Sequence, residues 1–225
     1  MDMTKKWMTI LLAGVAAASL AACGSQESGR GEGTSLSTPV AHEKESAAKT
    51  SHQADFQTSV FLGDSITEGL SFHDVLDEAN VSAGAGKTAE FALEDIDDLA
   101  KRNPQHVFIQ LGSDDILWPV ENPIAYSLDQ YAKLIGQIKE KLPKAKISIL
   151  TVTPVTAEAE KTEPRYKKIG QYNQGLKELA AKQQVEFIDL SPLFAGQPDL
   201  HDTDGIHFKA EFYPLLLDFI KEHTK

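Results

Sequence analysis

The side chains best suited to chemistry in this chain are those of Ser65 and His207. Ser65 follows an apolar run and precedes a helical pattern, which predicts a strand-to-helix turn. A serine hydroxyl becomes a nucleophile when it is exposed, held in place and next to a base. Such a turn meets the first two needs, and its free backbone N–H groups can face a developing negative charge. The structural alternative is a helix-capping box made by Ser65 and Glu68.

The segment Asp204–His207 lies on a predicted loop just before the last helical pattern. A histidine that acts as a general base needs its second ring nitrogen held by an acceptor. Asp204, three residues before His207, can supply that acceptor from the same loop. For these residues alone, a turn with a capping aspartate and a surface histidine is the alternative. His201 is a second candidate base, but it lacks the Asp-x-x-His spacing.

Five short apolar runs with β-branched residues alternate with helical patterns. The predicted strands are residues 58–63, 80–83, 106–111, 146–152 and 185–189, and the predicted helices are residues 88–101, 128–141, 166–182 and 210–223. This alternation predicts an α/β fold with a parallel sheet and helices on both faces. Active sites of such sheets lie beyond the carboxyl ends of the strands, which is where Ser65 is placed.

Four segments, in order along the chain, resemble the sequence blocks of the SGNH hydrolases, also called GDSL esterases and lipases. They are residues 63–69, 86–88, 112–115 and 204–207. The first looks like the family block Gly-Asp-Ser-x-Thr-x-Gly, and the last like its Asp-x-x-His block, with Tyr213 where the family often has an aromatic residue. In the second block Gly86 is the better match, and Gly84 is an alternative registration. The resemblance covers residues 58–223.

The resemblance implies the family's flavodoxin-like three-layer α/β/α sandwich with a five-stranded parallel sheet. It also implies acyl transfer, in which Ser65 attacks an ester carbonyl, His207 takes the proton and Asp204 orients His207. The backbone N–H groups of Ser65 and Gly86 would bind the oxyanion. Water would then release the acyl group, with no cofactor and no metal required.

Asp114 departs from the family pattern, because the third block of the family has an asparagine there that donates to the oxyanion. An ionised carboxylate cannot donate a hydrogen bond. Two alternatives follow. Burial and the neighbouring Asp115 raise the pKa of Asp114, so that a protonated acid donates as asparagine would. Otherwise Asp114 is ionised and turned away, and only the backbone donors remain.

The N-terminus predicts export. Two lysines precede an apolar run at residues 7–20 that is too short to span a bilayer, a pattern typical of an export signal. The run ends in Leu20–Cys23, which resembles the lipobox of bacterial lipoproteins. That resemblance implies removal of residues 1–22 and lipid attachment at Cys23; an ordinary secretory peptide is the alternative. Cys23 is the only cysteine, so the chain cannot form an internal disulfide.

Residues 23–55 are predicted to be a flexible tether, and residues 56–225 the hydrolase domain. Residues 24–55 are small and polar with no Phe, Trp or Tyr, so they cannot bury enough apolar surface to offset ordering. His42 and His52, which lie in it, are expected to have no role. We expect an extracytoplasmic monomer that is held at the cell membrane by its lipid anchor alone.

The negative net charge argues against nucleic acid as a partner. Removing residues 1–22, with two lysines and one aspartate, changes the net charge from −11 to −12. Such an acidic protein repels phosphate backbones, so nucleic acid is not an expected partner.

The favoured function is a carbohydrate or peptidoglycan O-acetyl esterase, or a short-chain esterase, that works at the cell envelope on a small-molecule or glycan ester. A lipase, lysophospholipase or thioesterase is the alternative within the enzyme class. A binding protein that kept the fold without the rate is the alternative outside it, prompted by Asp114. Ser65, Asp204 and His207 together favour an enzyme.

Overall fold

The computed structural model describes residues 51–196 and 200–224. The predicted signal peptide at residues 1–22, the predicted lipidation site Cys23 and the tether up to residue 50 lie outside the described residues. Within the described ranges, no helix combines the length and the apolar character needed to cross a membrane.

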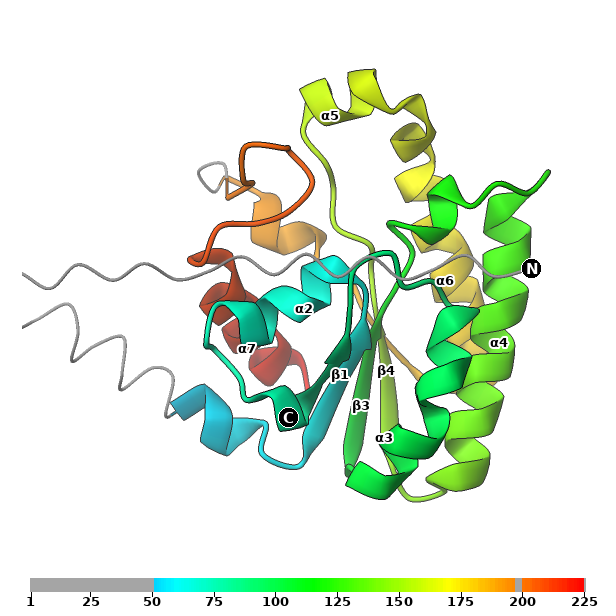
Figure 1. Ribbon diagram of the computed structural model, residues 1–225, viewed down its shortest axis with the longest axis vertical. Helices are drawn as coiled ribbons and strands as arrows, with labels where there is room; N and C mark the ends of the chain where they lie inside the picture. The colour runs from blue at the N-terminus through cyan, green and yellow to red at the C-terminus, as the bar shows by residue number, and fades with distance from the viewer. Residues whose placement is uncertain (1–50, 197–199, 225) are drawn as a thin grey trace, which may run out of the picture. The chain divides into compact units, whose positions relative to one another are not determined.

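Five parallel strands form one sheet in the order β2-β1-β3-β4-β5 (Figure 1). They are β1 Ser59–Gly63, β2 Val81–Ala83, β3 His106–Gln110, β4 Lys146–Leu150 and β5 Glu186–Ile188. All five predicted strands are confirmed. The chain adds β2 on one side of β1 and then crosses to β3 on the other side. The carboxyl end of β1 is therefore the switch point of the topology, where ligand sites of open α/β sheets form.

Helices cover both faces of the sheet, which confirms the predicted three-layer sandwich (Figure 1). On one face lie α2 Ser65–Phe72 and α7 Phe212–His223; on the other lie α3 Ile96–Arg102, α4 Pro123–Lys141 and α6 Ile169–Gln183. The short helix α5, Ala157–Thr162, lies beyond the carboxyl ends of the strands. Five 3-10 turns complete the described elements: Glu78–Asn80, Phe91–Asp95, Asp115–Leu117, Pro164–Lys168 and Ser191–Phe194.

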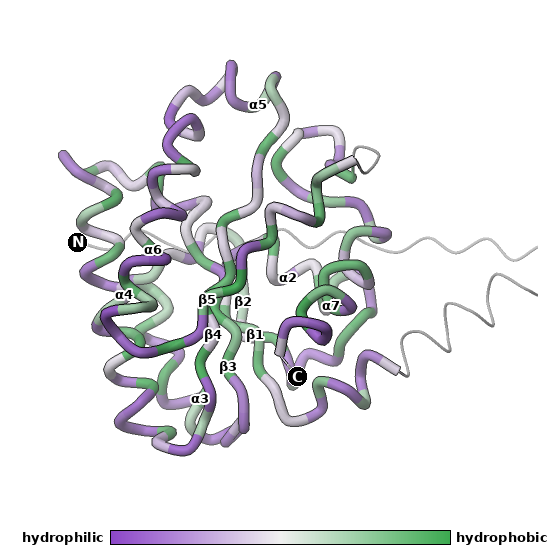
Figure 2. Tube along the Cα trace, turned by 180° about the vertical axis from the view of Figure 1, so that it is seen from behind, coloured by the Kyte–Doolittle hydropathy of each residue, from purple (hydrophilic) through white to green (hydrophobic). Residues whose placement is uncertain are grey.

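Alternate side chains of β1, β3, β4 and β5 pack in two separate cores. In β1, Val60 and Leu62 pack in the core beneath α3, α4 and α6, whereas Phe61 packs in the core beneath α2 and α7. Figure 2 shows the strands as the apolar centre of the fold and hydrophilic residues along the outer helices. Burial on both faces explains why the strands have near-continuous apolar sequences.

Several helix boundaries differ from the predicted ones. The helix predicted from residue 128 begins at Pro123, because the Asn122 side chain caps it by accepting from Ala125 N at 3.2 Å. The helix predicted from residue 88 begins as a 3-10 turn at Phe91 and becomes α-helical only at Ile96. The helices predicted from residues 166 and 210 begin at residues 169 and 212. Helix α5 was not predicted.

The assignment of residues 51–55 to the tether, and of His52 to no role, is wrong. These residues form a helical turn, and His52 is 5% exposed with Nε2 2.8 Å from Asp218 Oδ1 on α7. Gln53 donates to Asn80 Oδ1 at 2.7 Å and accepts from Asp77 N at 2.8 Å. Composition missed this turn because its attachment depends on polar partners in the domain and not on apolar burial.

Candidate active site

Asp64, and not Ser65, caps helix α2. Asp64 has an extended backbone, and its Oδ1 accepts from Ile66 N at 3.0 Å. Ser65 is therefore the first residue of the helix, and the capping-box alternative for Ser65 is wrong. Its hydroxyl is free for another partner, and the N–H of a first helical residue has no acceptor inside the helix.

The structure brings Ser65, His207 and Asp204 together although Ser65 and His207 are 142 residues apart. Ser65 Oγ lies 2.8 Å from His207 Nε2, and His207 Nδ1 lies 2.5 Å from Asp204 Oδ2. The second carboxylate oxygen, Asp204 Oδ1, accepts from the backbone N–H groups of Ile206 and His207, each at 2.9 Å. Hydroxyl, imidazole and carboxylate thus form the linear chain that nucleophilic acyl transfer requires.

Asp204 is held in its charged form. Burial raises the pKa of Asp204. The hydrogen bonds from His207 Nδ1 and from two backbone N–H groups lower this pKa by more than burial raises it, so it lies below its ordinary value. An ionised Asp204 fixes the proton of neutral His207 on Nδ1 and leaves Nε2 free to accept from Ser65.

Backbone hydrogen bonds close the loop that carries Asp204 and His207. Asp202 N donates to His207 O at 2.8 Å, and Lys209 N donates to Leu200 O at 2.9 Å. From outside the loop, Thr156 N donates to Gly205 O at 2.8 Å. Gly205 has φ +70°, and a Cβ there would lie 2.0 Å from Thr156 Oγ1, so only glycine fits. The triad geometry therefore depends on the segment that leads into α5.

His201 has a structural environment. Its Nε2 lies 2.9 Å from Pro154 O, and its ring packs at 4.7 Å from that of Phe208. These contacts of His201 hold one side of the loop that carries His207. The histidine that contacts the Ser65 hydroxyl is His207 and not His201.

Two glycines of the first block allow close packing around Ser65. A Cβ on Gly63 would lie 2.0 Å from Thr67 Oγ1 and 2.5 Å from Gln110 O on β3. A Cβ on Gly69 would lie 1.9 Å from Tyr213 Oη on α7. The block is therefore also a packing motif that seats α2 against its neighbours.

Gly86 lies in a tight turn after β2. Lys87 N donates to Gly84 O at 3.2 Å, and Gly86 has φ +74° at the third position of that turn. This position of a type II turn needs a positive φ. Space around a Cβ of Gly86 is open, so backbone conformation is what requires glycine there. Gly84 has no positive φ, so Gly86, and not Gly84, is the glycine of the second block that the backbone conformation requires.

Two buried aspartates join the blocks to one another. Asp115 Oδ1 accepts from Ala89 N at 3.0 Å and from Ser127 Oγ at 2.5 Å, which ties the third block to the segment after the second. Ser113 Oγ donates to Asp64 Oδ2 at 2.6 Å, which ties the third block to the first. Burial raises the pKa of Asp64 to about 7 and that of Asp115 to about 6.

Asp114 is partly exposed, and its Oδ2 is buried with no hydrogen-bond partner in the described part of the chain. Burial raises the pKa of Asp114, while the charge of nearby His207 lowers it, with a net rise. Asp114 therefore places, where the family has an asparagine, a carboxyl group that stays protonated to a higher pH than a free aspartate does.

Tyr166 is a candidate site residue that sequence reasoning missed, because it was treated only as the start of a helix. Burial, together with the negative charges of Asp114, Glu163 and Asp204, raises the pKa of Tyr166 to about 12. The phenol therefore lies among the carboxylates of the site. Pro164 two residues earlier was the available signal, since it marks a 3-10 turn and not a regular helix.

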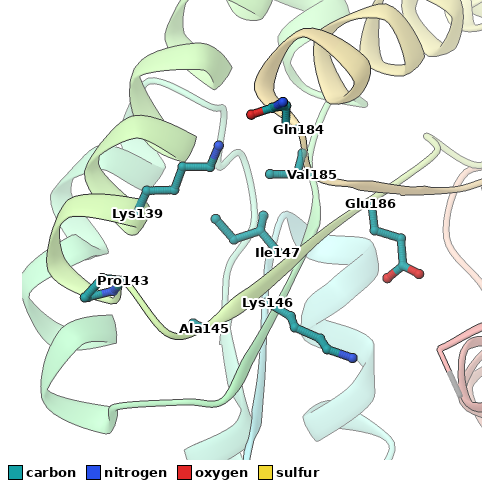
Figure 3. Close-up of a pocket in the computed structure, with 8 residues that line it drawn as sticks. All are labelled: Lys139, Pro143, Ala145, Lys146, Ile147, Gln184, Val185 and Glu186. Carbon is teal, nitrogen blue, oxygen red and sulfur yellow. The ribbon is translucent and has the colours of Figure 1, made fainter.

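The described cavities do not all lie at this site. A cavity of about 580 Å³, lined by residues that include Lys139, Lys146 and Glu186, lies at the amino ends of β4 and β5, at the opposite edge of the sheet (Figure 3). A cavity of about 280 Å³ adjoins Asp204 and is lined by α5 and the loop that carries His207. Over residues 51–196 and 200–224, no three His, Cys, Asp or Glu side chains are grouped to hold a metal.

Solved structures of several hydrolases have the same fold. A GDSL-like lipase from Bacteroides thetaiotaomicron matches with TM-score 0.61 and 18% identity, over 81% of this chain and 96% of that one. A psychrotrophic esterase from Pseudoalteromonas sp. matches with TM-score 0.54 and 20% identity, over 72% and 93%. An acetyl xylan esterase matches with TM-score 0.57 and 16% identity, over 74% and 99%.

Among curated protein sequences, no match to the chain is found. The family model for the GDSL-like Lipase/Acylhydrolase family matches residues 61–215, a range that runs from β1 through the first part of α7 and includes the paired Ser65, Asp204 and His207. The chain therefore belongs to the GDSL-like lipase/acylhydrolase family, the SGNH hydrolases.

Proposed function

We propose that Ser65, His207 and Asp204 are the catalytic triad of this acylhydrolase and that its substrates are small acyl esters, chiefly acetyl esters, of carbohydrates. The observation that carries the triad is the unbroken hydrogen-bonded chain, 2.8 Å from Ser65 Oγ to His207 Nε2 and 2.5 Å from His207 Nδ1 to Asp204 Oδ2.

In the first half-reaction, Ser65 Oγ attacks the ester carbonyl carbon while its proton passes to His207 Nε2. The tetrahedral intermediate collapses when the C–O bond to the alcohol breaks, and the alcohol oxygen takes the proton from His207. Water then attacks the acyl-enzyme with His207 again as the base, and the released products are the carboxylic acid and free Ser65. Asp204 stabilises the imidazolium in both halves.

The developing oxyanion is bound by backbone N–H groups of Ser65 and Gly86 in this mechanism. Ser65 N is suited to this because it lies at the start of α2, where the N–H has no partner within the helix. The positive φ of Gly86 gives the second turn its shape. Asp114 is the third donor when it is protonated.

The polar side chains around Asp204 support the proposal that the substrate carries a small acyl group on a carbohydrate. The lining of the cavity beside Asp204 includes the hydroxyl and carboxyl side chains of Thr156, Thr203 and Glu163. A long acyl chain gains little from such a lining, because it would displace water from polar groups without replacing their hydrogen bonds. The acetyl xylan esterase of the same fold acts on a substrate of the proposed class, according to its name.

A fluorophosphonate probe tests the activity directly, because it labels only an activated serine. The wild type should be labelled and should hydrolyse p-nitrophenyl acetate faster than the octanoate, whereas Ser65→Ala should do neither. A wild type that is folded yet unlabelled and inactive on a panel of acetylated sugars and p-nitrophenyl esters would identify a binding protein. A preference for the octanoate would identify a lipase instead.

We further propose that the protein is exported and anchored by lipid at Cys23. The support is the sequence at residues 5–23, with two lysines, an apolar run and Leu-Ala-Ala-Cys. In the native bacterial host, Cys23→Ala should move the protein out of the membrane fraction or leave residues 1–22 attached. Normal processing with unchanged membrane retention would contradict this proposal.

A further inference from the structure

We propose that this enzyme binds a glycan chain of several rings along the rim of the active site, with Trp118 and Phe91 as the stacking platform. This inference rests on the proposed esterase function and adds the form of its substrate: an oligomeric or polymeric glycan and not a single acetylated sugar.

The platform consists of two aromatic rings set at right angles. The ring centroids of Phe91 and Trp118 are 5.3 Å apart with an interplanar angle of 88°. Phe91 is 41% exposed and Trp118 is partly exposed, so the pair is not buried in a core. Aromatic rings of this size are normally covered, and an exposed pair is suited to a ligand with an apolar face.

A buried hydrogen bond fixes the two segments that carry the platform rings next to the proposed oxyanion site. Phe91 follows Ala89 by two residues, and Trp118 follows Asp115 by three. Ala89 N donates to Asp115 Oδ1 at 3.0 Å, so both rings extend from the same buried hydrogen bond. Because β2 and β3 lie on either side of β1, their following segments flank Ser65.

An ion pair continues the rim from the platform to the triad. Arg165 Nη1 donates to Leu117 O at 2.8 Å, next to Trp118, and Arg165 Nη2 lies 2.6 Å from Glu163 Oε2. Glu163 in turn lines the cavity of about 280 Å³ that Asp204 also lines. Aromatic pair, ion pair and polar cavity therefore follow one another along one rim.

This succession fits the chemistry of a glycan. One face of a sugar ring presents C–H groups that pack on the negative face of an aromatic ring, while its hydroxyls bond to charged and polar side chains. An acyl chain would match the rings but would offer no hydrogen-bonding group to the Arg165–Glu163 pair or to the polar side chains of the cavity. The rings and the cavity are connected through Arg165 and Glu163, so a chain of sugar rings can contact both at once.

The kinetic test uses chemically acetylated glucose, cellobiose and cellotetraose beside p-nitrophenyl acetate. For the wild type, kcat/KM should rise with the number of rings, mainly through a lower KM. In Trp118→Ala and in Phe91→Ala, the ratio of kcat/KM on the tetrasaccharide ester to that on p-nitrophenyl acetate should fall at least about tenfold. The matched control is Phe72→Ala, which removes a 79% exposed ring at the far end of α2 and should leave the ratio unchanged.

A binding test does not depend on turnover. The chain has two tryptophans, Trp7 and Trp118. Trp7 lies in the segment whose removal is proposed above, so the emission of the processed protein reports Trp118 alone, and in unprocessed protein Trp7→Phe gives the same readout. Unacetylated cellotetraose should change that emission with a lower Kd than glucose, and Phe91→Ala should weaken the binding.

Equal losses on all esters in the platform variants, or a loss confined to p-nitrophenyl esters of long acyl chains, would overturn the glycan platform. Failure of the esterase proposal looks different, since Ser65-dependent hydrolysis would then be absent from every ester while the emission titration could still succeed.

Discussion

The side chain of Asp115 holds the backbone N–H of Ala89 at 3.0 Å, and this bond connects the segment after β2 to the segment after β3. Ser127 donates to the same oxygen and contacts Tyr172 Oη at 2.6 Å, so the bond belongs to a buried network between the sheet and helices α4 and α6. The segments that follow two different strands are thereby fixed relative to each other at the site.

Asp115→Ala should lower both stability and activity. The substitution leaves the Ala89 N–H buried without an acceptor, which costs about 1–3 kcal/mol. For a domain of this size, each kcal/mol lowers Tm by about 2–4 °C. Thermal unfolding measures the first effect, and kcat on p-nitrophenyl acetate at a temperature well below Tm measures the second. Asp97→Ala, which removes an exposed partner of Lys141, is the control and should change neither appreciably. Equal behaviour of the two variants would mean that the Ala89 bond is unimportant.

His207 and His201 should differ sharply when each is replaced by alanine. His207→Ala removes the base 2.8 Å from Ser65 Oγ and should lower kcat by about a thousandfold or more. His201→Ala removes a bond to Pro154 O and a ring contact, and should lower kcat less than about tenfold. Steady-state kinetics on one activated acetyl ester decides between them. A larger loss in His201→Ala would assign the base to the wrong histidine.

Asp114→Asn should raise kcat/KM at pH 8. Burial raises the pKa of Asp114, so its protonated, donating form persists to higher pH than in a free aspartate but is lost as the pH rises through that pKa. Losing one oxyanion donor costs roughly 3 kcal/mol, or about a hundredfold in rate. Wild-type activity should therefore decline toward alkaline pH while the Asn variant keeps its rate. A flat or lowered rate for Asp114→Asn from about pH 5 to 9 would give Asp114 another role, such as holding substrate.

Stability should fall as pH rises from 5.5 to 8. The folded-state pKa of Asp64, raised by burial from 3.8 to about 7, lies above the unfolded value. The folded protein therefore holds a proton that the unfolded chain releases, and the associated stability is lost as pH rises through about 7. Asp64→Asn should reduce the slope of Tm against pH, because an amide does not titrate and the Ser113 hydroxyl can rotate to accept from it. An unchanged slope in this variant would place the pH dependence elsewhere, with Asp115 as the next group to replace.

Deleting the residues before Phe56 should destabilise the domain. A chain that starts at Ser51 keeps the buried His52–Asp218 bond and the two bonds of Gln53, whereas one that starts at Phe56 loses all three. A loss of about 2 kcal/mol lowers Tm by about 4–8 °C. Comparing the two chains by thermal unfolding tests this, with the chain that starts at Ser51 and carries His52→Ala as an intermediate case. Identical Tm values would return residues 51–55 to the tether.

The strands and the Asp204–His207 pair were predictable because their signals are local. A buried strand needs a short apolar run, and β1 through β5 each have one. The spacing of Asp204 and His207 places both on one loop, so their contact needs no knowledge of the fold. Ser65 was placed by its turn and by the resemblance of residues 63–69 to a known block.

The remaining features depend on partners that are distant in the sequence. Asp64 rather than Ser65 caps α2, a choice that becomes clear only once the Ser65 hydroxyl is seen to face His207. The charges of Asp114 and Asp204 raise the pKa of Tyr166, and helix α5, which precedes Tyr166, was not predicted. The turn at residues 51–55 is ordered by contacts with α7 and with the segment before β2.

That turn also gives the domain two opposite poles. Residues 51–55 lead into the amino end of β1, and Asp55 accepts from Lys221 near the carboxyl end of α7, whereas Ser65 leaves the carboxyl end of β1 (Figure 1). Chain attached upstream of residue 51 therefore joins the domain on the side that faces away from Ser65. An enzyme coupled to a bead through its N-terminus should present the mouth of its site outward and should process a bulky insoluble polymer as well as the free enzyme does.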